Sequence, residues 1–132
     1  MYRVELRDAQ GNLFSQTLNT WQFNKFSGST STDERAFTRL SDTVTRIFDG
    51  NATHKDRANS FIYEVSTGNL VSTVDYGEVI GADNGTFQDV GTDKVTSDYL
   101  YAVPETGGDA NLIGIIYQKT TKDYNNSKIS EV

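Results

Sequence analysis

The sequence contains no cysteine, one histidine and one proline among its 132 residues. Without cysteine the chain can form no disulfide, no zinc–thiolate centre and no cysteine nucleophile. The glycine-rich phosphate loops of nucleotide-binding proteins are missing, and so is the HExxH pair of zinc hydrolases. These absences give no support to a cofactor or a metal, and we expect the protein to use neither.

Long apolar runs are missing as well. No stretch approaches the roughly 18 consecutive apolar residues of a membrane span. Residues 1–10 alternate charged and apolar side chains and lack the apolar centre of a secretory signal. The formal net charge of −6 disfavours nucleic acid and anionic membranes as partners. We therefore expect a protein that is made in the cytoplasm, is not secreted, and contacts neither a membrane nor nucleic acid.

Residues 31–49 show the clearest periodicity in the chain. Apolar side chains recur there at the spacing of one helical face: Phe37, Leu40, Val44, Ile47 and Phe48. Ser31 and Glu34 have the spacing of a capping box, and Gly50 is a typical helix stop. The pattern predicts one amphipathic helix that lies across a sheet and supplies half of the core.

Most of the remaining chain has the pattern of strands and turns. Apolar or alternating runs predict strands over residues 2–7, 61–65, 70–74, 79–80, 86–88, 95–103 and 112–117. Residues 112–117 are apolar on both faces, which predicts a central strand covered on each side. The predicted fold class is α+β, a mainly antiparallel β-sheet or sandwich with one helix over about 31–49 packed on it.

One domain accounts for most of the chain. We expect a single α+β domain over residues 1–119 and a polar C-terminal tail over residues 120–132. Ordering each residue of the tail costs about 1 to 2 kcal/mol of backbone entropy, which the isolated Tyr124 and Ile129 cannot offset. The tail is therefore expected to be ordered only when it docks on another copy of the chain.

The titratable residues form no recognisable catalytic motif. His54 lies in a charged loop, where Asp56 could orient it, but a solvated loop histidine is the favoured interpretation. Six carboxylates gather in the second half of the chain: Asp75, Glu78, Asp83, Asp89, Asp93 and Asp98. Their spacing fails the EF-hand template, and solvated turns explain them best. We expect no catalytic residue and no metal site.

Tyrosines offer a different kind of candidate site. Tyr99, Tyr101 and Tyr117 would crowd one face if the strands over 95–103 and 112–117 pair as a hairpin. Aromatic cross-strand pairs stabilise sheets, and we prefer this interpretation to a protein interface, where tyrosine is also common. Together with the two tail residues, the candidate interface consists of Tyr99, Tyr101, Tyr117, Tyr124 and Ile129.

The hypothesis that follows is a non-enzymatic, self-assembling structural protein. By analogy of composition, we expect a small phage or virion component of the capsid, decoration or tail-connector type, which leaves the cytoplasm within the particle. Its partners would be copies of itself and other assembly proteins. The first alternative is a small acidic accessory protein that inhibits a host factor by surface binding. The second is a ligand-binding module with a pocket between helix and sheet, lined by Trp21, Tyr63 and the tyrosines. An enzyme comes last.

Overall fold

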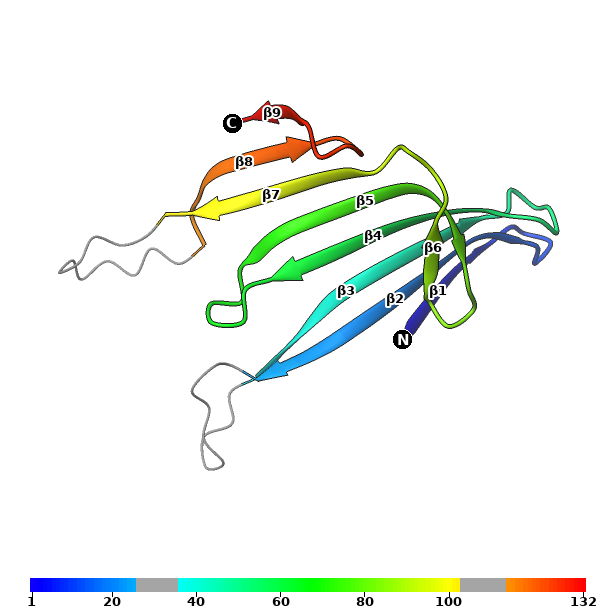
Figure 1. Ribbon diagram of the computed structural model, residues 1–132. Coiled ribbons are helices and arrows are strands. Elements are labelled where there is room, and N and C mark those ends of the chain that lie inside the picture. Colours follow the sequence, from blue (N-terminus) through cyan, green and yellow to red (C-terminus); the bar gives the residue numbers. More distant parts are fainter. Residues whose placement is uncertain (26–35, 103–113) are drawn as a thin grey trace.

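The chain folds into one antiparallel β-sheet. The structure is a computed structural model, and it describes residues 1–25, 36–102 and 114–132. The spatial order of the strands is β1-β2-β3-β4-β5-β7-β8-β9, and β6 pairs with β5 outside this row (Figure 1). The strands are β1 (Tyr2–Arg7), β2 (Leu13–Lys25), β3 (Ala36–Ile47), β4 (Lys55–Tyr63), β5 (Leu70–Gly81), β6 (Phe87–Asp89), β7 (Val95–Tyr101), β8 (Ile116–Lys122) and β9 (Lys128–Glu131).

The predicted helix is wrong, and the fold class is all-β in the described residues rather than α+β. Ala36–Ile47 is strand β3, hydrogen-bonded between β2 and β4, while residues 31–35 lie outside the described residues. Four residues of this strand are threonine or valine, namely Thr38, Thr43, Val44 and Thr45. Such β-branched side chains favour extended backbone. An extra residue at Ser41 shifts the register opposite Thr20 and Trp21. Such a bulge breaks the period-two pattern, which made the apolar positions resemble a helical face.

The two faces of the sheet have different environments. Residues paired across strands share a face, so Leu18, Val44 and Ala58 lie side by side on one of them. We call this the core face. Together with Val79, these residues are the buried hydrophobic side chains of the described part of the chain, and Tyr76 and Phe87 pack against them.

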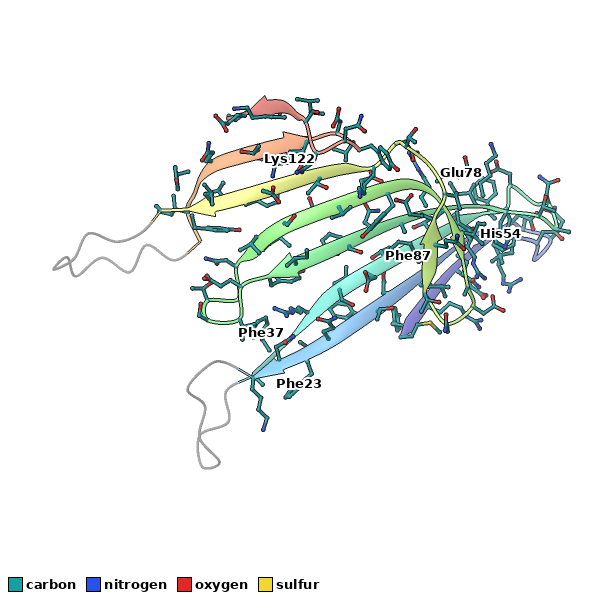
Figure 2. All side chains as sticks on the ribbon, viewed as in Figure 1. Phe23, Phe37, His54, Glu78, Phe87 and Lys122 are labelled. Carbon is teal, nitrogen blue, oxygen red and sulfur yellow. The ribbon has the colours of Figure 1, made fainter. Side chains whose placement is uncertain are left out.

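The β5–β6 hairpin covers the core. The register between β4 and β5 shifts between Ala58 and Asn59, and Gly77 has a positive φ of 63°. Strand β5 therefore bends at this point. The hairpin then lies across the sheet, with Phe87 of β6 above the core strands (Figure 2). Gly81 passes so close that an added Cβ would lie 2.8 Å from Cγ1 of Val44. Only glycine fits at that crossing.

The opposite face, which we call the open face, carries Tyr2, Val4 and Leu6 of β1. Their cross-strand partners on β2 are Asn19, Thr17 and Ser15. Every pair of described strands in substantial contact is a hydrogen-bonded pair within the sheet, so no second layer packs on this face. The described part of the chain is a single-layer sheet with one local cover.

The strand predictions were better than the helix prediction. The strand over residues 2–7 is confirmed as β1, and the strand over residues 70–74 is confirmed as the start of β5. A turn closed by the bond from Glu64 N to Asn69 O (2.8 Å) precedes it. The predicted central strand over 112–117 is wrong. Residues 112–113 lie outside the described residues, and Ile116 and Tyr117, which begin β8, are 49% and 62% exposed.

The C-terminal segment expected to be a tail is placed within the sheet. Residues 120–122 complete β8, and Lys128–Glu131 forms β9 beside it. A turn closed by Asp123 joins the two strands, with its carboxylate accepting from Ser127 N at 2.8 Å. In-sheet hydrogen bonds order this segment without help from the apolar contacts of Tyr124 and Ile129.

Candidate functional site

A buried arginine holds the covering hairpin to the sheet. Arg46 of β3 is 6% exposed, and it donates to Asp83 Oδ1 at 2.6 Å and to the carbonyl of Gly81 at 2.9 Å. The same guanidinium donates to Gln16 Oε1 on β2 at 3.3 Å. The hydrogen bond from Arg46 lowers the pKa of Asp83 below its ordinary value. This cluster fixes the hairpin in place.

His54 lies at the same end of the sheet, beside a buried carboxylate (Figure 2). Asp56 is 5% exposed, and its Oδ1 contacts Nδ1 of His54 while its Oδ2 accepts from Gly81 N at 2.8 Å. The ring of Phe48 lies 4.8 Å from the imidazole, centroid to centroid. His54 lies in the loop before β4 and is exposed, as expected, while its imidazole contacts Asp56 and Phe48.

The signal for this pair was present in the sequence. Positions 54 and 56 are two apart along extended chain, and such residues project to the same side. A shallow depression of about 570 Å³ adjoins His54. Hydrolysis by a histidine–carboxylate pair also needs a nucleophile bonded to the free imidazole nitrogen. Among the described residues, His54 contacts Asp56 and no hydroxyl group is bonded to its imidazole.

The six carboxylates do not converge. Asp98 on β7 accepts from Lys122 Nζ at 2.7 Å and from Ser72 Oγ at 2.8 Å, and Lys122 lowers its pKa. Asp93 accepts from the backbone N of Glu78 at 3.1 Å, and Asp83 pairs with Arg46. The ranges that the structure describes contain no group of three acidic or histidine side chains that could hold a metal ion.

The candidate interface residues divide into two sets. Tyr99 and Tyr101 are half-buried in the sheet, where the hydroxyl of Tyr101 donates to Leu70 O at 2.7 Å and burial raises its pKa. Three others are exposed: Tyr117 (62%), Tyr124 (44%) and Ile129 (59%). Nζ of Lys94 lies 5.7 Å from the ring centroid of Tyr124. The structure therefore does not bring the five together as one patch.

The sequence analysis did not single out β1, whose three apolar side chains are all exposed. All six residues of β1 are exposed, and Tyr2, Val4 and Leu6 are 63%, 48% and 58% exposed on the open face. Trp21 and Phe23 of β2, 48% and 66% exposed, continue this face beyond the end of β1. Strict alternation over 2–7 indicated a half-buried strand, but it could not show that the apolar half had no cover.

Comparison of the sequence with models of known protein families and with curated protein sequences finds no match. The described residues include no helix that is long and apolar enough to cross a membrane.

Proposed function

We propose that this is a non-enzymatic structural protein that assembles with copies of itself through its sheet. The observation that carries the proposal is the single layer. A sheet must bury an apolar face against another element, yet the described residues bury only four hydrophobic side chains. Exposed apolar side chains such as Val4, Leu6 and Phe23 are typical of an interaction surface.

The setting of this assembly is a separate part of the proposal. A small component of a virus or phage particle remains our proposal for where such assembly takes place, and it rests on analogy of composition and architecture. A small acidic protein that blocks another protein is the alternative, because an exposed edge strand can also pair with a strand of a foreign chain. A ligand pocket beneath a helix is not proposed further, since residues 36–47 form a strand.

The mass of the protein in solution tests the proposal. Light scattering coupled to size-exclusion chromatography, run over a concentration series, should give a mass above that of one chain that rises with concentration. A strictly monomeric protein at the highest accessible concentration would contradict self-assembly and favour the inhibitor.

A further inference from the structure

Strand β1 forms one edge of the sheet. It pairs with β2 on one side, and no described strand pairs with its other side (Figure 1). Such an edge presents a row of free backbone donors and acceptors, which can template pairing with another chain. Neither proline nor lysine, which proteins use to block edges, occurs in β1, and its charged residues are Arg3, Glu5 and Arg7.

The edge is also held in a fixed conformation. The turn that joins β1 to β2 is closed by Asp8, whose backbone N donates to Asn12 O at 3.0 Å. The carboxylate of Asp8 accepts from the backbone N of Asn12 at 2.8 Å and of Gln10 at 2.9 Å. Because the strand is already ordered, pairing with a second strand carries a small entropic cost.

We propose that β1 pairs antiparallel with β1 of a second copy, with Val4 facing Val4 on a two-fold axis, so that two sheets join into one. The inference rests on the proposed function and adds the partner, the strand and the register. A pairing of this kind is isologous, because the same surface is used by both copies.

Charge complementarity selects this register. With Val4 opposite Val4, Arg3 of each copy lies opposite Glu5 of the other, and Tyr2 lies opposite Leu6. The two charged residues share the core face, because their partners on β2 are Leu18 and Gln16. The dimer therefore gains two pairs of opposite charge on one face and a continuous apolar row on the other.

The neighbouring registers lack this complementarity. A shift of the pairing by two positions in one direction places Arg3 opposite Arg3, and in the other direction it places Glu5 opposite Glu5. Like charges directly opposite each other destabilise a sheet. Shifts by one position place charged side chains opposite apolar ones, and parallel pairing again sets Arg3 against Arg3.

The arginine side chains of β1 are exposed, whereas Glu5 already has partners within the chain. Within one chain, Glu5 contacts Arg7 Nη2 at 2.8 Å and Arg3 Nε at 3.4 Å. The side chains of Arg3 and Arg7 are 60% and 51% exposed, so either can turn toward a neighbouring strand.

The opposite edge of the sheet is less suitable for pairing with a second copy. Strand β9 has four residues, and its register with β8 shifts between Thr121 and Lys122. Lys128 and Glu131 stand at its two ends. Short length, a bulge and terminal charges are the usual means of protecting an edge. The register of β1 also shifts, between Leu6 and Arg7, but β1 has six residues and is the longer edge. This difference in length favours a closed β1–β1 dimer over head-to-tail growth from β1 to β9.

Charge reversal tests the register. The full-length variants R3E and E5R each place like charges opposite one another twice in the dimer, and both should dimerise about tenfold or more weakly than the wild type. The double variant R3E/E5R restores opposite charges and should dimerise as the wild type does. Light scattering measures the dimer, and circular dichroism confirms that each variant is folded.

Mixing the two single variants separates this pairing from contacts within one chain. R3E copies carry acidic side chains at positions 3 and 5, and E5R copies carry basic side chains at both. An equimolar mixture should form a heterodimer although neither variant dimerises well alone. A change that acted only within the chain could not be repaired by adding the other variant.

An engineered crosslink gives a second measurement if a charge variant fails to fold. The chain has no cysteine, so V4C introduces the only thiol. Directly opposed Cβ atoms are about 4.5 to 5.5 Å apart, within reach of a disulfide after a small adjustment. Under mild oxidation V4C should give a crosslinked dimer. L6C is the matched control, because two such thiols would lie four positions apart, about 13 Å.

The outcomes are distinct. The β1 pairing would be overturned, with self-assembly intact, by three results together. R3E and E5R would oligomerise as strongly as the wild type, their mixture would form no additional heterodimer, and V4C would crosslink no better than L6C. Open-ended polymers with the same insensitivity would indicate head-to-tail growth instead. A wild-type protein that stays monomeric would contradict the proposed function itself.

Discussion

At the scale of single residues, the molecule depends on a very small core and on polar contacts across strands. Leu18 and Val44 are the largest fully buried side chains, with 1% and 0% exposure. Elsewhere the strands are joined by side-chain bonds, such as Ser60 Oγ to Asp42 Oδ1 at 2.6 Å. Substitutions at a few buried positions should therefore lower the free energy of unfolding strongly, whereas substitutions at most other positions should change it little.

Leu18→Ala tests the core. Removing a fully buried leucine leaves a cavity and should lower the free energy of unfolding by about 2 to 5 kcal/mol. Leu100→Ala is the matched control, because Leu100 is 49% exposed and its loss should change stability by no more than about 0.5 kcal/mol. Urea unfolding of both variants at low protein concentration measures the difference. Equal effects would show that the hairpin does not protect a core.

The ion pair between Asp98 and Lys122 makes stability depend on pH. Lys122 lowers the pKa of Asp98 below the ordinary 3.8, so the folded state binds this proton less tightly than the unfolded state does. The stabilisation is present above pH 3.8 and is lost as the pH falls through the folded pKa.

Asp98→Asn should therefore be less stable than the wild type at neutral pH, with the gap closing in the acid range. Urea unfolding at a series of pH values measures the gap. Lys122→Gln removes the cause of the shift and should show the same convergence. A gap that stays constant down to the lowest pH would contradict this assignment.

At the scale of elements, the β5–β6 hairpin is the one piece of the described chain that crosses the sheet. It is attached by Arg46 and Asp56 from below and by the packing of Phe87 above. Strands were predicted over residues 79–80 and 86–88, and the Asn84–Gly85 pair between them is a tight-turn signal. In the structure Gly85 has a φ of 80° and Ala82 N donates to Thr86 O, so local turn chemistry is sufficient to form this hairpin.

Gly81→Ala tests the crossing. The new Cβ would lie 2.8 Å from Val44 Cγ1 and 3.0 Å from Asp56 Oδ2, so the hairpin must shift away from the core. We expect a loss of about 1 to 3 kcal/mol, as for other overpacked positions. In the double variant with Val44→Ala the two costs should be less than additive, because the clashing methyl is gone. Full additivity in thermal unfolding would show that the two residues do not meet.

At the scale of the whole molecule, the sequence predicted many strands but not their arrangement in one layer. The hairpins around Gly11, Gly68 and Gly85 follow from turn residues, which act locally. Whether a second layer covers Tyr2 or Ile116 depends on contacts between distant segments, which periodicity does not report. The error at 31–49 has the same origin, because a mixed apolar pattern interrupted by a bulge at Ser41 resembles a helix when its neighbours are unknown.

The order of the strands also determines how the protein can fold. Along the row β1-β2-β3-β4-β5-β7-β8-β9, neighbours in space are neighbours in sequence except where β6 intervenes. Each pairing therefore closes a comparatively short loop, so the sheet can grow by adding one hairpin to the next. The same arrangement lets the sheet open from its ends, as in repeat proteins whose units contact only their neighbours. Backbone amides of β3 and β4 beneath the hairpin should exchange with solvent last, whereas those of β9, at the edge farthest from the core, should exchange early.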